Sequence, residues 1–140
     1  HWVDMSRTTG IVCQRSQIMV ADIKDGTSNT YLAGEKCVTH DNYRGEAGNG
    51  TVGNYDYGDD GPALSGDDLD LCRWGGASYP PVQDTPGVAA YWLFGSAHAD
   101  SFNMAFCDGS VRTISYSIER KIHGYLANRK DDQPVDASNY

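Results

Sequence analysis

The pattern of apolar and polar positions divides the first part of the chain into two predicted strands with a turn between them. Residues 10–19 alternate and are β-branched in places, which is typical of a strand, and residues 31–38 form a second such segment. The intervening sequence ADIKDGTSNT predicts a short helical turn that Gly26 ends in the left-handed conformation. The residues that follow are able to cap exposed backbone groups through their side chains: Thr27, Ser28 and Asn29.

Residues 102–115 carry the strongest local pattern in the sequence. Two apolar runs, FNMAFC and SVRTIS, meet at Asp108 and Gly109, and Asp-Gly is a preferred pair for a two-residue type I′ turn. The pattern therefore predicts a β-hairpin in which Phe106 lies opposite Val111. Its two faces would carry Met104, Phe106, Val111 and Thr113 on one side, and Ala105, Cys107 and Ile114 on the other. We expect both faces to be covered.

A C-terminal helix is predicted directly after the hairpin. Ser117 is placed to cap its start, and Asn128 is placed to end it. The helix has an apolar stripe that would pack onto the sheet, made of Ile118, Ile122, Tyr125 and Leu126. The tail that follows, residues 129–140, is polar and is expected to lie extended across the surface.

Residues 39–86 form a long irregular segment that is rich in Gly, Asn, Asp and Tyr. Five aromatic side chains could hold it by packing: Tyr43, Tyr55, Tyr57, Trp74 and Tyr79. We expect it to be mostly ordered, with one short strand or turn inside it. The length fits a single domain, residues 1–140. The predicted fold class is α+β, with a small antiparallel sheet, a C-terminal β-hairpin and helix, and this long Gly/Asp-rich loop.

The negative charge is concentrated in one segment. The whole chain has a net charge of −8, and residues 41–70 contain eight acidic residues against Arg44 alone, a net of −7. Nucleic acids and anionic membrane surfaces bind clustered Lys and Arg, so this composition argues against both as partners. The apolar stretches are also shorter than the roughly 20 residues that span a bilayer. We expect no membrane contact by this chain.

The acidic segment is a candidate calcium site. Carboxylates interspersed with glycine suit a hard cation, and the candidate ligands are Asp56, Asp59, Asp60, Asp67 and Asp68. The spacing does not fit an EF-hand, because no glutamate stands at the twelfth loop position. The alternative is a solvated acidic loop without a bound ion. The aromatic residues of the same segment could stack on sugar rings, or pack within the loop.

Four cysteines are widely spaced and contain no C-x-x-C pair: Cys13, Cys37, Cys72 and Cys107. A zinc ribbon or a thioredoxin-type pair is therefore disfavoured. Two disulfides would form in an oxidising compartment, and Cys37 with Cys72 is the first pairing to test. The alternative is four reduced thiols that act as small apolar side chains.

His98 and Asp108 resemble the histidine and carboxylate of a general base. Each also has a structural explanation, since Asp108 belongs to the hairpin turn and His98 could bind backbone groups near it. No G-x-S-x-G sequence surrounds Ser96, Ser101 or Ser110, so no nucleophile is indicated. We therefore predict structural roles for both residues and no enzymatic activity. If His98 is structural, His98→Ala should destabilise the hairpin by about 1–3 kcal/mol.

The segment GSAHADSFNMAFCDGSVR, residues 95–112, places nine residues between His98 and the pair Asp108-Gly109. This spacing resembles the H-x9-DG signature of a family of pilin-like proteins abundant in planctomycete-type bacteria. Further blocks in the same order resemble that family: DGTSNT at residues 25–30, QDTPG at residues 83–87, and the C-terminal sequence from Ser115 to Ser138. The chain departs from the family pattern at Ala99-Asp100.

The resemblance implies an exported protein of the cell surface or extracellular space that acts as a structural subunit in a filament or envelope assembly. Its partners would be other pilin-like subunits or copies of itself, without catalysis and without an assured cofactor. Family members carry a long N-terminal helix before an α+β head. This chain begins at His1 and corresponds to the C-terminal part of the head, so we expect it to be processed or truncated. The signature residues would then be structural: Asp25, Gly26, Ser28, Asn29, His98, Asp108 and Gly109.

A second hypothesis is an extracellular module that binds calcium or surface polysaccharide through the acidic, aromatic segment.

Overall fold

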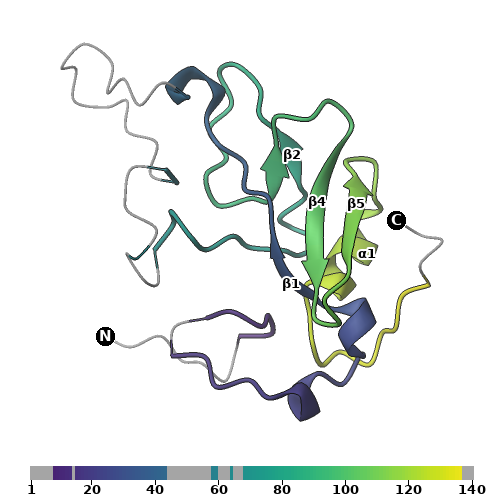
Figure 1. Cartoon of the computed structure of the whole chain (residues 1–140). Helices are drawn as coiled ribbons and strands as arrows, with labels where there is room; N and C mark the ends of the chain where they lie inside the picture. The colour runs from purple at the N-terminus through teal and green to yellow at the C-terminus, as the bar shows by residue number, and fades with distance from the viewer. Residues whose placement is uncertain (1–7, 14, 44–57, 60–63, 65–67, 137–140) are drawn as a thin grey trace.

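The computed structural model describes residues 8–13, 15–43, 58–59, 64 and 68–136. Three of its strands form an antiparallel sheet in the order β1-β4-β5: β1 (Tyr31–Gly34), β4 (Ser101–Phe106) and β5 (Val111–Ser115). The helix α1 (Arg120–Leu126) lies behind this sheet (Figure 1). The structure confirms a mixed α+β fold with a small antiparallel sheet and a C-terminal helix.

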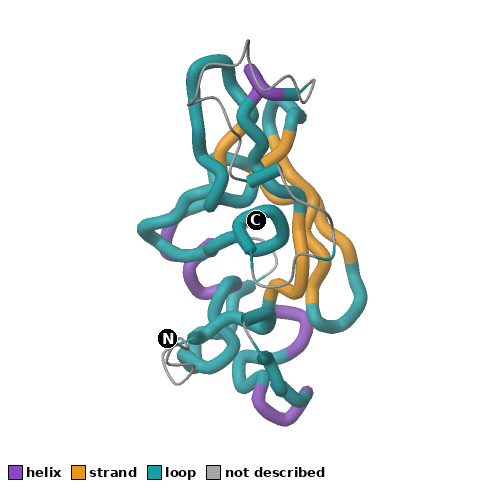
Figure 2. Tube along the Cα trace, turned by 90° about the vertical axis from the view of Figure 1, so that its left-hand side faces the viewer, coloured by secondary structure: helices purple, strands orange, loops and turns teal. Residues whose placement is uncertain are grey.

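Two shorter strands, β2 (Val82–Gln83) and β3 (Gly95–Ser96), pair in parallel beside that sheet. Short 3₁₀ turns complete the regular structure of the described ranges: η2 (Val20–Asp22), η3 (Thr27–Asn29) and η4 (His40–Asn42). Loops connect these elements over long distances, and the strands gather along one side of the molecule (Figure 2). The long irregular segment predicted from the sequence does contain one short strand, β2.

The β4–β5 hairpin is confirmed, but its register differs by one residue from the predicted register. Ala105 pairs with Val111, and the N–H of Phe106 donates to the Ser110 carbonyl at 2.8 Å, so three residues form the loop. Only Gly109 among them has a positive φ, +85°. A type I′ turn requires positive φ at both central residues, whereas a three-residue loop needs one residue in the left-handed region.

The core lies on one face of the sheet. Phe102, Met104 and Phe106 of β4 are fully buried, and so is Ile114 of β5, which the one-residue shift places on their side. The same apolar cluster includes Tyr31, Ile118, Leu126 and Val135. Burial of each large apolar side chain contributes about 1.5–3 kcal/mol, so this face binds the helix to the sheet. The opposite face is open, since Val111 is 69% exposed, and the prediction that both faces are covered is wrong.

The strand predicted over residues 31–38 changes its pairing partner at Glu35, from β4 to the segment that leads into β3. This residue follows β1, donates its N–H to the Asn103 carbonyl of β4 at 3.0 Å, and accepts the N–H of Gly95 in β3 at 3.0 Å. Cys37 then donates its N–H to the Leu93 carbonyl at 3.1 Å. The chain thus leaves β4 and pairs with the segment that leads into β3, so the fork at Glu35 joins the two sheets.

The strand predicted over residues 10–19 is wrong. The described part of this segment folds back on itself: the Ser16 hydroxyl donates to the Ile11 carbonyl at 2.7 Å, and the Ser16 N–H donates to the Cys13 carbonyl at 2.9 Å. Arg15 has a φ of +59°, which interrupts an extended run. The alternating pattern therefore finds no partner strand.

The helix α1 begins later than predicted, with Glu119 in place of Ser117 as its N-cap. The Ser117 hydroxyl lies 2.8 Å from the Ser115 hydroxyl, so it is used in the turn before the helix. The apolar stripe is nevertheless buried, since Ile118 is 8% exposed and Leu126 is fully buried. No helix in the described ranges is long and apolar enough to cross a membrane.

The tail is not confined to the surface. Arg129 and Val135 are each only 7% exposed, and Val135 belongs to the main apolar cluster. The prediction of a tail lying extended across the surface is therefore wrong for these two positions, because an apolar side chain and a buried guanidinium fix it to the body.

Candidate functional site

The DGTSNT block, residues 25–30, contacts the hairpin turn directly. The Thr30 carbonyl accepts the N–H of Cys107 at 3.0 Å, and the Thr27 carbonyl accepts the N–H of Asp108 at 3.1 Å. Two sequence motifs that lie about eighty residues apart are therefore joined at the end of the sheet where β4 turns into β5 (Figure 1). We call this contact the motif junction.

Gly26 has the positive φ that the sequence predicts, +93°, but its position in the turn differs. It stands before η3 as its N-cap, whereas the prediction had it ending a helix. Asn29 caps the backbone as expected, because its side-chain amide donates to the Asp25 carbonyl at 3.1 Å. Ser28 is exposed. A side chain at Gly26 would be strained, which explains a glycine at this point of the block.

Asp25 binds the C-terminal tail to the motif junction. Its side chain is buried, and its two carboxylate oxygens accept the backbone N–H groups of Asp131 at 3.0 Å and Asp132 at 2.7 Å. Asp132 has a φ of +57°, so the two successive N–H groups form a concave nest that suits an anionic oxygen pair. Partial burial raises the pKa of the Asp131 carboxyl, and the nearby charge of Asp25 adds to this. Asp25 is thus satisfied by the chain itself.

Asp108 is used in the hairpin turn. Its carboxylate accepts the side-chain O–H of Ser110 at 2.7 Å and the backbone N–H of Ser110 at 2.9 Å, and these bonds lower its pKa. Arg112 lies 3.6 Å from its other oxygen and stacks over the Phe106 ring at 4.1 Å. The structural role predicted for Asp108 fits these contacts.

His98 lies before β4, whereas Asp108 lies beyond its far end. Six strand residues extend for about 20 Å, so the two side chains do not form a pair. The imidazole is 62% exposed, and its Nε2 lies 3.5 Å from Glu35 Oε1. Glu35 Oε2 accepts the N–H of Asn103 at 2.7 Å. The His98 side chain therefore contacts the Glu35 side chain at the fork. Within the described residues its ring makes no hydrogen bond to the backbone near the hairpin, which is the contact that the sequence interpretation suggested.

A family model described as a protein of unknown function (DUF1559) matches residues 1–121 of the 140-residue chain. This chain belongs to the DUF1559 family. The match includes both halves of the motif junction and is compatible with the pilin-like resemblance, while the narrower H-x9-DG assignment stays a prediction. No curated protein and no solved structure gives a significant match.

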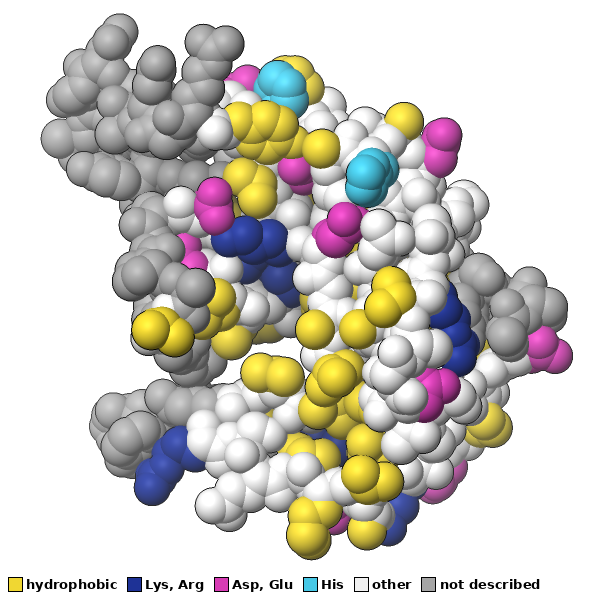
Figure 3. All heavy atoms as spheres, in the orientation of Figure 1, with side chains coloured by type: hydrophobic (Ala, Val, Ile, Leu, Met, Phe, Trp, Pro, Cys, Tyr) yellow, Lys and Arg dark blue, Asp and Glu magenta, His cyan; other side chains and the backbone are white. Residues whose placement is uncertain are grey.

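The base of the acidic segment in this DUF1559 chain is held by two of the chain's own cations, and Figure 3 shows basic side chains with acidic side chains around them on this face of the molecule. The Lys36 ammonium donates to the carbonyls of Gly58 at 2.8 Å and Asp70 at 3.1 Å, and it also binds the Asp59 carboxylate. Arg73 donates to the same Gly58 carbonyl at 3.0 Å. Lys36 thus occupies a group of oxygens for which a metal ion would have to compete.

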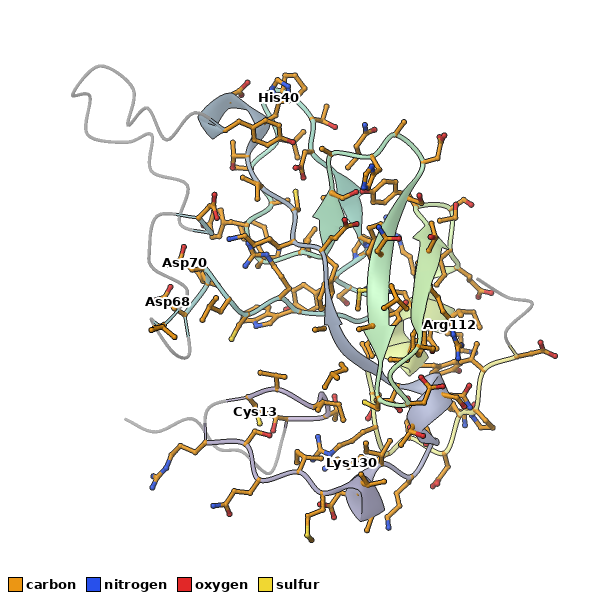
Figure 4. The ribbon with its side chains drawn as sticks, in the orientation of Figure 1. Cys13, His40, Asp68, Asp70, Arg112 and Lys130 are labelled. Carbon is orange, nitrogen blue, oxygen red and sulfur yellow. The ribbon has the colours of Figure 1, made fainter. Side chains whose placement is uncertain are left out.

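The predicted calcium ligands are only partly described. Asp56, Asp60 and Asp67 lie outside the described residues, while Asp59 is bound to Lys36 as above. Asp68 accepts the N–H of Asp70 at 3.4 Å, and Figure 4 shows these two residues close together on one loop. Among the residues that the structure describes, no three His, Cys, Asp or Glu side chains are grouped to hold a metal ion. Calcium binding stays a prediction.

All four cysteines are described, and the structure joins none of them in a disulfide: Cys13, Cys37, Cys72 and Cys107. The suggested bridge between Cys37 and Cys72 is not formed. Cys37 is fully buried in a second, smaller apolar cluster. Burial raises the pKa of the Cys107 thiol, which lies 3.7 Å from the Tyr31 carbonyl.

His123 is a buried residue that the sequence interpretation missed. Its Nδ1 lies 3.4 Å from the Tyr31 hydroxyl, and the rings of Phe94 and Phe102 are each 6.3 Å away. Nε2 is buried and has no hydrogen-bond partner among the described residues. Burial lowers the His123 pKa from 6.5 to about 4, so the ring is neutral at pH 7. In the sequence, only its position next to the apolar stripe of the predicted helix could have indicated that this residue is buried.

Arg129 is the second missed residue. Its carbonyl accepts the N–H groups of Lys24 at 2.7 Å and Asp25 at 3.4 Å, which connects the tail to the start of the DGTSNT block. A single arginine in a polar tail gives no sequence signal of burial. The residue lies in the C-terminal block that resembles the family, and it binds the tail to the segment of the chain that leads into the motif junction.

Proposed function

We propose that this DUF1559 chain is a structural, non-enzymatic subunit of the pilin-like kind, exported to the cell surface or beyond, and that it acts in a filament or envelope assembly. The family match is compatible with this proposal. The H-x9-DG resemblance adds the finer assignment, and the partners would be copies of this chain or other pilin-like subunits.

The motif junction is the observation that supports the proposal best. The motif residues Asp25 and Asp108 have their carboxylates occupied by N–H and O–H groups of the chain itself. The third motif residue with a titratable side chain, His98, lies at the other end of β4 and is mostly exposed. The motif residues thus hold three chain segments together. This use of a motif, for the fold of the head domain and not for chemistry at a site, fits a structural subunit.

Immunogold electron microscopy of the native cells, with an antibody against this chain, tests the proposal. Gold particles are expected on the envelope or on filaments, and native material is expected to elute as a large assembly in size-exclusion chromatography. Gold confined to the cytoplasm, or native material that elutes as a monomer, would contradict it. The variant Asp25→Ala should reduce surface labelling because the head is destabilised, whereas Asp100→Ala, at an exposed position, should not.

An extracellular polysaccharide-binding module is the second candidate, and one observation favours it. Trp74 is 52% exposed. Its backbone N–H donates to the Trp92 carbonyl at 2.9 Å, and its ring packs edge-on against Tyr79 at 5.2 Å. A fixed, exposed indole is suited to stacking on a sugar ring. A glycan array should then show binding that Trp74→Ala abolishes and Leu71→Ala, at another exposed apolar side chain, preserves. An array without any binding to the intact chain would count against this module.

The calcium-binding form of the same module is tested by titration with calcium chloride. Heat of binding that disappears in Asp59→Ala and Asp60→Ala would favour it. The bond between Lys36 and Asp59 makes the acidic segment a weaker candidate than Trp74, because a metal ion would have to displace an ammonium group.

A further inference from the structure

The N-terminal arm (residues 8–13) is bound to the body through one residue of the tail. The backbone N–H of Arg129 donates to the Thr9 carbonyl at 3.0 Å. The Arg129 guanidinium, through Nη1, donates to the carbonyls of Thr8 at 2.9 Å and Gly10 at 2.6 Å. Three consecutive carbonyls of the arm therefore meet at Arg129. Figure 4 shows the arm, marked by Cys13, beside the tail, marked by Lys130.

The Arg129 guanidinium is buried, and the described residues compensate only part of its lost hydration. The residue is 7% exposed, and its Nε has no hydrogen-bond partner within those residues. No carboxylate in the described part of the chain lies within ion-pair distance of it. A buried guanidinium prefers a bidentate carboxylate, and neutral carbonyls offset its lost hydration less well. Opening to water would therefore recover part of the free energy that the closed contact costs.

No residue of the arm is buried as deeply as the core, although Thr8, Ile11 and Cys13 are half-buried. Along the described chain, the first buried residue is Asp25, and the apolar core begins at Tyr31. Within the arm, the Thr8 hydroxyl lies 3.7 Å from Cys13 Sγ, and Val12 is 66% exposed. Segments with few buried contacts open locally at much lower free energy than the core. The arm can leave the body without exposing the sheet.

Arg129 itself is fixed from its other side. Its carbonyl accepts the N–H groups of Lys24 and Asp25, so the residue stays bound to the start of the DGTSNT block when its bonds to the arm are broken. One residue thus has two kinds of backbone contact, one to the arm and one to the body.

We propose that the N-terminal arm is a strap that opens and closes over Arg129 while the β1-β4-β5 sheet and α1 stay folded. Opening breaks the bonds to Thr8, Thr9 and Gly10 and exposes the guanidinium. Closing buries it again. The proposal concerns a single chain and holds whether or not the chain assembles or binds a ligand.

Amide hydrogen exchange followed by NMR, in increasing sub-denaturing urea, tests the strap. The amide of Arg129 reports the bond to the arm, and the amide of Lys24 reports the bond to the body, so each is the control for the other. We expect the Arg129 amide to exchange at least about tenfold faster than the Lys24 amide, with little dependence on urea, because a local opening exposes little surface. Equal rates with the same urea dependence would overturn the proposal, since the arm would then leave only on global unfolding.

A variant pair identifies the latch. In Arg129→Met the two guanidinium bonds are lost, and the amide at position 129 should exchange about tenfold to a hundredfold faster, with the Lys24 amide unchanged. Lys130→Met, at the exposed neighbouring position, should leave both amides as they are. If Arg129→Met does not fold, Arg129→Lys keeps the charge and one donor, and it should show an intermediate rate. An unchanged rate at position 129 in the folded variant would show that the guanidinium does not hold the arm.

Discussion

The carboxylate of Asp25 accepts the backbone N–H of Asp132 at 2.7 Å, across a sequence separation of 107 residues. The other oxygen accepts the neighbouring N–H of Asp131. The first residue of the DGTSNT block is therefore explained by the path of the tail. The Asp25 carboxylate binds the tail to the DGTSNT block.

Replacing Asp25 should destabilise the fold. Asp25→Ala leaves two partly buried N–H groups without a charged acceptor, so we expect a loss of about 2–3 kcal/mol in the free energy of unfolding, measured with urea. Asp25→Asn keeps one side-chain oxygen and should lose less. Asp100→Ala is the control and should stay within about 0.5 kcal/mol of the parent. Parent-like stability of Asp25→Ala would refute the anchoring role.

Because His123 is buried as a neutral ring, the free energy of unfolding should decrease in mild acid. Below pH 6.5 the unfolded chain binds a proton on this residue, while the folded chain does not until about pH 4. Stability should therefore be independent of this group above pH 6.5 and should decrease between pH 6.5 and 4, by about 2 kcal/mol between pH 7 and pH 5. Urea titrations at these two pH values should show this difference in the parent and in His98→Gln. They should show a smaller one in His123→Phe. A pH dependence equal in all three chains would mean that His123 is not buried as a neutral ring.

Substitutions at Gly109 should lower the stability of the fold according to how readily the new residue adopts a positive φ. Outside Gly109 and its two chain neighbours, no atom of the described residues lies within 4 Å of a Cβ at this position, so the conformation opposes substitution more than the space does. We expect Gly109→Ala to cost about 1–2 kcal/mol and Gly109→Asn to cost less, because asparagine adopts the left-handed region more readily. Thermal unfolding measures both variants. The reverse order would indicate that another feature of the turn decides.

His98→Ala should have little effect on stability, which corrects the loss of about 1–3 kcal/mol that the sequence interpretation predicted for a buried partner. The imidazole is 62% exposed and lies 3.5 Å from Glu35, and exposed ion pairs contribute about 0–1 kcal/mol. We expect a change below about 0.5 kcal/mol in urea unfolding, with Asp108→Ala more destabilising because its turn bonds are lost. A large loss in His98→Ala would require a buried contact that this geometry lacks.

The hairpin could be predicted from the sequence because its determinants are local: two apolar runs and an Asp-Gly pair. Its register could not, because the choice between a two-residue and a three-residue loop depends on the contacts of the turn with a distant block. The N–H groups of Cys107 and Asp108 are bound by carbonyls of Thr30 and Thr27. The one-residue difference moved Ile114 to the buried face.

The candidate site was predictable only in part, for the same reason. The turn role of Asp108 follows from its neighbours in sequence. Asp25 and Arg129 bind groups about 100 residues away or more, and periodicity carries no information about such partners. The alternation in residues 10–19 was misleading, because a strand also needs an edge to pair with.

The fork at Glu35 has a consequence for how chain length can vary among related proteins. Just beyond it, the N–H of Val38 donates to the Asp84 carboxylate at 3.0 Å, so the two ends of the intervening segment are fixed to each other. The entropy cost of closing a loop grows only with the logarithm of its length, about 0.6 kcal/mol for each doubling. Insertions and deletions between Val38 and Asp84 that leave β2 (Val82–Gln83) and its pairing with β3 in place should therefore be tolerated, because neither sheet depends on the length of the rest of this segment.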